Sequence, residues 1–267
     1  MPATPLREGP LQLLFQAPDL RRFDLPEPLQ VAYAGPFGLP DDCMYANFVA
    51  SVDGVVALRT AEESGQIISG GSEADRFVMG LLRACADVVL LGAGTFRKAA
   101  GHLWHAESIH PQAAPQFAEL RRRLGLRSHP PLVVVTATGE IDPAQPALRD
   151  SIIVTTPAGE ARLQGRVPPT ARFESGPIRL RPLVERLRRE GYRRILTEGG
   201  PTLASQLVAE GLLDELFLTR SPTLFGRAAS DGRKGLIEGV DLSGRTVELT
   251  DLRRHGSYVF LRYRLGA

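Results

Sequence analysis

Short apolar runs alternate with amphipathic stretches along most of the chain. From Tyr45 onward the apolar runs are rich in β-branched residues and have the length of strands that are covered on both faces. The last two runs flank Arg254-His255-Gly256, which predicts an antiparallel hairpin. The predicted strands are Tyr45–Ser51, Asp87–Leu91, Pro131–Thr136, Ser151–Thr155, Arg193–Thr197, Glu215–Arg220, Thr246–Arg253 and Ser257–Arg264.

Four stretches between these runs have helical periodicity and recognisable ends. Ser72 opens one of them with the pattern of a capping box, and Thr202 is a favourable N-cap for another. Gly191 and Gly211 follow two of the stretches, where a glycine commonly ends a helix. The predicted helices are Ser72–Ala86, Pro115–Leu124, Leu180–Glu190 and Thr202–Glu210.

Strands that alternate with helices predict an α/β fold with a mostly parallel mixed sheet, flanking helices and a C-terminal antiparallel hairpin. We expect a single folded domain over residues 43–267. Residues 1–42 are rich in Pro and Gly and show no sustained period. They predict an extended N-terminal arm with one short packed element at Leu11–Phe15.

The composition narrows the class of protein. The chain has 267 residues and a formal net charge of +2, which argues against a dominant nucleic-acid or membrane surface. No apolar run reaches membrane-spanning length, and no apolar signal-peptide core stands at the N-terminus, so we expect a cytoplasmic protein. Two cysteines, Cys43 and Cys85, are too few for a disulfide scaffold or a zinc cluster.

Three histidines lie close together in the sequence, at His102, His105 and His110. No Cys or carboxylate stands at ligand spacing from them, so we expect no metal site. A loop around Trp104 that covers a substrate pocket is the preferred interpretation.

Three predicted strands end in turns of small residues, and these turns carry the candidate chemistry. They are Gly92-Ala93-Gly94-Thr95, Thr136-Ala137-Thr138-Gly139 and Glu198-Gly199-Gly200-Pro201-Thr202. In open α/β sheets, ligands bind outside the carboxyl ends of the strands. Glycine allows close approach of the backbone to phosphates, which helix N-termini also attract. Any one turn alone is equally consistent with ordinary tight-turn chemistry. The three together, with an acid at Glu198, indicate a dinucleotide beside a polar substrate.

An ordered set of short motifs resembles a known family. Its members are Asn47–Gly54, Ile68–Gly70, Leu82–Ala84, Gly92–Thr95, Thr197–Pro201 and Gly211–Glu215. In this order they resemble the pyrimidine reductases of riboflavin biosynthesis, the C-terminal reductase domain of the bifunctional deaminase–reductase. The resemblance covers roughly Tyr45 to Gly226 and implies a dihydrofolate-reductase-like fold. It also implies a homodimer.

The resemblance implies an NADPH-dependent reduction of 5-amino-6-(5-phosphoribosylamino)uracil to its ribitylamino product. For cofactor binding it implies Gly92, Gly94, Thr95, Thr136, Gly199, Gly200 and Thr202, with Thr136 near the adenosine 2′-phosphate. For the substrate it implies Asn47, Ser69 and Arg83. Glu198 is the first candidate for the proton donor and Asp53 the second, with water as a third source.

Two departures from the family pattern keep other functions open. Val55 stands where relatives usually carry Lys. Phe96–His105 replaces the Asp-Asp-Pro-x-Leu-Thr-x-Arg stretch that helps relatives to bind the ribose phosphate, so the usual acid pair is absent. These differences favour a paralogue that reduces another small heterocycle, such as a dihydropterin. A nucleotide-binding protein without catalysis is the third possibility, since glycine turns alone do not require chemistry.

Overall fold

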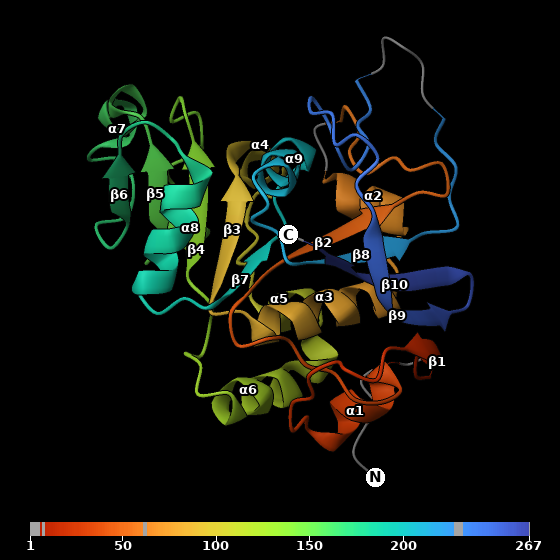
Figure 1. Cartoon of the computed structure of the whole chain (residues 1–267). Coiled ribbons are helices and arrows are strands. Elements are labelled where there is room, and N and C mark those ends of the chain that lie inside the picture. The colour runs from red at the N-terminus through yellow and green to blue at the C-terminus, as the bar shows by residue number, and fades with distance from the viewer. Residues whose placement is uncertain (1–5, 7–8, 61–62, 227–231, 267) are drawn as a thin grey trace.

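A ten-stranded sheet forms the centre of the protein (Figure 1). The computed structural model describes residues 6, 9–60, 63–226 and 232–266. The strands lie in the order β1-β9-β10-β8-β2-β7-β3-β4-β5-β6. Their bounds are β1 Gln12–Gln16, β2 Cys43–Ala50, β3 Val88–Gly92, β4 Leu132–Thr136, β5 Ile152–Thr155, β6 Arg172–Ser175, β7 Arg194–Thr197, β8 Glu215–Arg220, β9 Val247–His255 and β10 Tyr258–Leu265.

Seven neighbouring strands, from β8 to β6, are parallel, whereas β1, β9 and β10 are antiparallel. The α/β fold with a mostly parallel mixed sheet, flanking helices and a terminal hairpin is therefore confirmed. All eight predicted strands are present within a few residues of their expected bounds. Strand β6 was missed because it is a short edge strand with polar residues and no apolar run.

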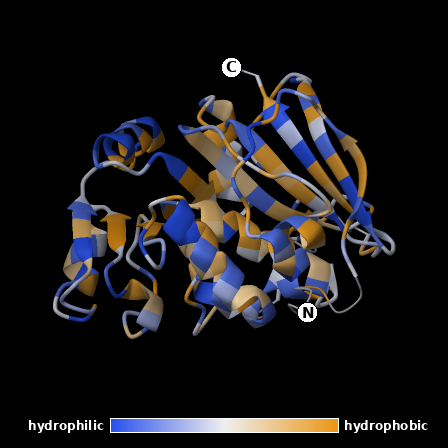
Figure 2. Cartoon of the chain, turned by 90° about the horizontal axis from the view of Figure 1, so that it is seen from below, coloured by the Kyte–Doolittle hydropathy of each residue, from blue (hydrophilic) through white to orange (hydrophobic). Residues whose placement is uncertain are grey.

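Helices cover both faces of the sheet. Their bounds are α1 Glu27–Tyr33, α2 Ser64–Ser69, α3 Glu73–Cys85, α4 Ala93–Lys98, α5 Ala106–Ile109, α6 Ala114–Arg123, α7 Pro157–Leu163, α8 Leu180–Arg189 and α9 Pro201–Ala209. One hydrophobic cluster joins the sheet to α1, α3 and α6 through Leu29, Phe77 and Phe117. A second cluster joins the opposite face to α8 and α9 through Leu187 and Leu207. Hydrophobic and hydrophilic residues alternate along the covering helices, as amphipathic layers require (Figure 2).

Residues 9–42 are more ordered than the predicted extended arm. The expected packed element is strand β1, which pairs with β9 at the edge of the sheet. Helix α1, which was not predicted, buries Leu29 and Tyr33 against the main core. It starts at Glu27-Pro28, and the prolines there were read as breakers, although proline is favoured in the first turn of a helix.

The buried side chain of Arg253 fixes this region to the sheet. Its guanidinium donates to the carbonyl oxygens of Tyr33, Ala34 and Pro36 and pairs with Asp251.

None of the helices in the described ranges is long and apolar enough to cross a membrane.

Candidate active site

A cleft of about 630 Å³ opens at the carboxyl ends of the central strands. Its floor includes Asn47 of β2, Gly92 of β3 and Val135 of β4. The first turns of α4 and α9 and one side of α3 form its walls. This is the position at which open α/β sheets bind their ligands.

The cleft brings together nine of the twelve predicted site residues. They are Asn47, Arg83, Gly92, Gly94, Thr95, Glu198, Gly199, Gly200 and Thr202. The other three, Asp53, Ser69 and Thr136, are not among the residues that line it.

The Asp53 carboxylate anchors a loop. It accepts hydrogen bonds from the Ser51 hydroxyl at 2.6 Å and from the backbone N–H groups of Phe225 and Gly226. The bond from Ser51 is the main reason that the pKa of Asp53 falls to about 2. Such a carboxylate retains its charge and holds the turn after β2 against the segment that follows β8.

The other two residues outside the cleft lining are Ser69 and Thr136. The Ser69 hydroxyl donates to the carbonyl oxygen of Gln66, and the Ser69 carbonyl accepts a hydrogen bond from the Tyr258 hydroxyl. Thr136 is buried at the end of β4, next to Val135, which does line the cleft.

The two glycine turns meet at the centre of the cleft. A methyl group on Gly199 would lie 2.7 Å from Leu203 Cδ2 and 3.2 Å from the backbone nitrogen of Gly92. A methyl group on Gly94, in contrast, would meet no protein atom within 4 Å. The absence of side chains at these positions therefore serves two different purposes. Gly199 allows the turns to pack together, whereas Gly94 keeps space open on the side of the cleft.

The beginning of α9 completes an anion-binding surface. Its N-cap is Gly200 rather than the predicted Thr202, and no side chain caps the first turn. Pro201 at the first helical position carries no N–H, and the Leu203 N–H donates to the Gly200 carbonyl oxygen, so Thr202 supplies the N–H of this turn that can meet a ligand. Free N–H groups at a helix N-terminus attract negative charge, and phosphate in particular. The open space at Gly94 and this exposed helix turn fit the pyrophosphate of a nicotinamide dinucleotide.

A buried ion pair faces the glycine turns. Arg83 Nη2 lies 2.7 Å from Glu198 Oε2, and Arg83 Nε lies 3.1 Å from both oxygens of the same carboxylate. The exposed fractions of the two side chains are 3% and 8%. Because Arg83 occupies both oxygens, Glu198 is poorly placed to give a proton to a ligand.

Asp75 is a site residue that the sequence analysis missed. It lines the cleft at the start of α3, on the same helix face as Met79 and Arg83, and is 5% exposed. Loss of water contact raises its pKa to about 6, and the charge of Glu198 adds to the rise, while a hydrogen bond with Thr219 opposes it.

The sequence pattern around Asp75 pointed to a different role. The capping-box pattern that Ser72 opens includes Asp75, and the backbone N–H of Asp75 does donate to the Ser72 hydroxyl. The sequence does contain a signal for this role. Asp75, Met79 and Arg83 are spaced by four residues, which places a carboxylate and a guanidinium on one helix face.

The loop around Trp104 lines the cleft, as expected. Trp104 is 3% exposed, and its ring stacks on Phe96 of α4 with 5.6 Å between the ring centres. This contact joins the loop to the helix that follows β3.

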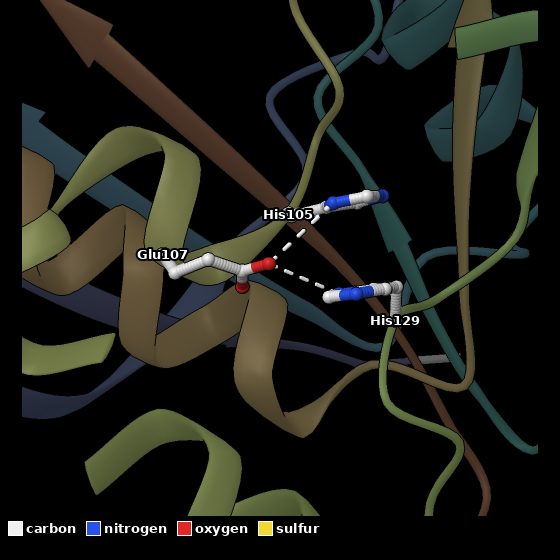
Figure 3. A group of neighbouring side chains, drawn as sticks. All are labelled: His105, Glu107 and His129. Carbon is white, nitrogen blue, oxygen red and sulfur yellow. Dashed lines mark ion pairs between the residues drawn. The ribbon is translucent and has the colours of Figure 1, made fainter. Parts of the chain in front are cut away.

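A second group of polar side chains includes His105, whose backbone contacts Arg83. His105, Glu107 and His129 come together although His129 is distant in sequence, so a carboxylate does lie near a histidine of the loop (Figure 3). Both Nδ1 atoms face the same Glu107 oxygen, at 3.5 Å and 3.1 Å. The imidazole planes are within 8° of parallel with 4.0 Å between the ring centres, so the two rings stack on each other beside the carboxylate. The group supports the His105 backbone, whose carbonyl oxygen accepts a hydrogen bond from Arg83.

Comparisons with known proteins agree with this architecture. The chain is 28% identical over 224 residues to a 2,5-diamino-6-ribosylamino-4(3H)-pyrimidinone 5′-phosphate reductase of Archaeoglobus fulgidus, which covers 78% of this chain and 96% of the relative. A solved structure of a pyrimidine reductase-like protein from Corynebacterium diphtheriae matches 90% of this chain and 98% of its own, with a TM-score of 0.68 and 20% identity.

The reductase Rib7 of Saccharomyces cerevisiae matches 87% of this chain and 94% of its own, with a TM-score of 0.57 and 17% identity. These similarities confirm the expected dihydrofolate-reductase-like fold. The profile described as the RibD C-terminal domain matches residues 43–261, which is most of the sequence. The chain therefore belongs to the RibD C-terminal domain family.

Proposed function

We propose that the protein is an NADPH-dependent reductase that acts on a phosphorylated ribosylamino-pyrimidine in riboflavin biosynthesis. The observation that carries the proposal is the cleft in which two glycine turns and the open end of α9 face a buried Asp75, Arg83 and Glu198. A nucleotide surface and a polar surface thus share one cavity. The name of the archaeal relative supplies the substrate class.

The nucleotide surface suits a nicotinamide dinucleotide. Gly94, Thr95, Gly200 and Thr202 would hold its phosphates, with Gly92 and Gly199 keeping the two turns in contact. When bound, the reduced nicotinamide supplies a hydride to the carbon of an imine-like bond in the opened sugar. Arg59 and Arg97 also line the cleft and add positive charge, which favours NADPH over NADH.

The polar surface would orient the substrate and complete the reduction. Asn47 is 8% exposed at the cleft and offers both a donor and an acceptor to a pyrimidine ring. The paired Arg83 and Glu198 fix the polar wall. Asp75 would add one proton to the substrate nitrogen while the adjacent carbon takes up the hydride, because its raised pKa keeps part of the population protonated near neutral pH.

The resemblance implies a homodimer, and the composition predicts a cytoplasmic protein that needs no nucleic acid; we include these expectations in the proposal. Leu13, Leu14 and Phe15 are exposed on β1, at the edge of the sheet, which supports a contact with a second copy. Light scattering after size-exclusion chromatography tests the dimer.

The decisive assay follows NADPH absorbance in the presence of the ribosylamino-pyrimidine phosphate. Dihydrofolate serves as the alternative acceptor. Val55 is fully buried and places no cation in the cleft, and this departure from the family pattern favours a paralogue that reduces a dihydropterin. Oxidation of NADPH by the pyrimidine supports the proposal. Oxidation by dihydrofolate alone would favour the paralogue, and NADPH binding without either reaction would favour a nucleotide-binding protein.

A further inference from the structure

The chain uses lysine in only two places, and both lie in the same cleft. Of the 32 Lys and Arg residues, 30 are Arg, and the two lysines are Lys98 and Lys234. They are far apart in sequence, yet both line the cavity that contains the glycine turns. Because nearly all other basic residues of the chain are arginines, the two lysines in one cleft indicate that this site requires ammonium groups.

Both lysines are held by the segment that follows β2. Lys98, the last residue of α4, donates from Nζ to the carbonyl oxygen of Leu58 at 2.7 Å. The backbone of Lys234 pairs with Ala57 in an antiparallel bridge, with N–H···O distances of 2.9 and 3.3 Å. The same short segment therefore positions the side chain of one lysine and the main chain of the other.

The second ammonium group lies at the open end of α9. Lys234 Nζ is 3.3 Å from Thr202 Oγ1, in the first turn of that helix. This turn has no side-chain cap, and Thr202 and Lys234 both line the cleft, so the positive end of the helix dipole and the ammonium group adjoin the same part of the cleft. The N-terminus of this nine-residue helix and the ammonium group beside it are two sources of positive potential.

Among the described residues, neither ammonium group has a carboxylate partner. Within the described ranges, no carboxylate comes within ion-pairing distance of Lys98 or Lys234, whereas many of the arginines do have such partners. Burial lowers the pKa of Lys98, and the nearby charge of Lys234 lowers it further. Two like charges held in one cleft attract a multivalent anion.

We propose that Lys98 and Lys234 form a clamp that binds a phosphoryl group of a ligand between α4 and the first turn of α9. Ammonium groups suit this task because each is a rotatable point charge that can follow a tetrahedral phosphate, without the planar geometry of a guanidinium. The proposed function enters the clamp at one point: it supplies the two ligands whose phosphoryl group the lysines could bind. These groups are the pyrophosphate of the dinucleotide and the phosphate ester of the substrate.

Amine labelling tests the clamp directly, because the chain has few targets. An acetylating reagent specific for primary amines can modify only Lys98, Lys234 and the N-terminal amine. Peptide mass spectrometry should show that inorganic pyrophosphate or phosphate slows labelling of both lysines and leaves the N-terminal amine unaffected. Equal labelling rates at saturating anion would overturn the clamp. This readout needs no turnover, so it stands even if the pyrimidine is not reduced.

Substitutions then identify the phosphate source. Lys98→Met and Lys234→Met should each weaken binding about tenfold, the usual effect of losing one charge-assisted bond. If the clamp holds the pyrophosphate, the Kd values of NADPH and NADH rise together. If it holds the substrate ester, KM rises for the phosphorylated pyrimidine only, and the dephosphorylated compound is unaffected.

Two control variants separate the clamp from general charge and folding effects. Arg166→Met removes one exposed positive charge that does not line the cleft, and its binding constants should match those of the parent protein. Lys98→Arg and Lys234→Arg should recover part of the lost affinity. Methionine variants that fold normally and bind both cofactors and the pyrimidine with unchanged constants would refute the proposal.

Discussion

Arg83 binds both carboxylate oxygens of Glu198 and thereby joins the middle of the cleft wall on α3 to the end of β7. The two residues are 115 positions apart in sequence, and both are nearly inaccessible to water. The Arg83 guanidinium also donates to the His105 carbonyl oxygen. It therefore joins α3, the end of β7 and the loop that contains His105.

Removal of Arg83 should destabilise the protein strongly. Arg83→Met leaves the Glu198 carboxylate buried without its partner, which typically costs about 3 to 5 kcal/mol. Denaturant unfolding measures this cost. The matched double variant Arg83→Met/Glu198→Leu removes both charges and should recover most of the stability. A loss below about 1 kcal/mol in the single variant would show that the pair is not needed for the fold.

The activity of the protein should fall as pH rises through about 6, because Asp75 is protonated below its raised pKa and loses its proton above it. Asp75→Asn should remove this step from the kcat/KM profile and lower turnover by about 100-fold or more, as loss of a general acid does. Glu198→Gln is the comparison, and it should retain the pH step. If Glu198→Gln removes the step and Asp75→Asn retains it, Glu198 is the proton donor.

The same shift predicts how Asp75 affects stability. Its folded pKa lies above the ordinary value of 3.8, so the folded protein holds this proton more tightly than the unfolded chain. The resulting stabilisation is present below pH 3.8 and is lost as pH rises through about 6. The free energy of unfolding of Asp75→Asn, relative to the parent, should therefore increase over this interval. A constant difference would contradict the shift.

His110 should make the protein less stable in mild acid. The side chain is buried between Phe77 and Phe117, and burial lowers its pKa below 6.5. The unfolded chain therefore binds a proton that the folded protein resists, so the contribution of His110 is full above pH 6.5 and is lost as pH falls. His110→Phe should unfold with a weaker pH dependence between pH 7 and 5 in thermal melts.

Two glycine substitutions should have opposite effects on stability. Gly94→Ala places its methyl group in open space within α4, so it should stabilise the helix by about 0.5 to 1 kcal/mol while weakening cofactor binding. Gly139→Ala should destabilise the protein, because its methyl group would lie 2.5 Å from the Gly159 carbonyl oxygen at a φ of 67°. Melting temperatures and an NADPH fluorescence titration measure both effects. Unchanged NADPH affinity in Gly94→Ala would remove this turn from the cofactor site.

Much of the fold could be predicted because its strands are continuous apolar runs. Val133 and Val134 are fully buried on a strand with helices on both sides, and a run of that kind has few alternative structures. The glycine turns were also predictable, since each directly follows such a run.

Other features depend on contacts that sequence spacing does not encode. Asp75 gains its shifted pKa from tertiary burial and from Glu198, which lies on another element. Lys98 and Lys234 are brought together by the segment at Ala57 and Leu58, which is distant from both in sequence. The placement of Asp53 outside the cleft follows from the loop at Phe225 and Gly226, a contact across more than 170 residues.

The order of the strands constrains how the protein can be made. Strand β2, near the start of the chain, lies between β7 and β8, and the first strand pairs with β9. Neither β1 nor β2 has its hydrogen-bonding partners until more than half of the chain has been synthesised. Long-range pairing of this kind slows folding and leaves strand edges exposed. During translation the nascent chain therefore carries the apolar strand β2 unpaired, and assembly of the cleft, with Asn47 on that strand, is one of the last events of its biogenesis.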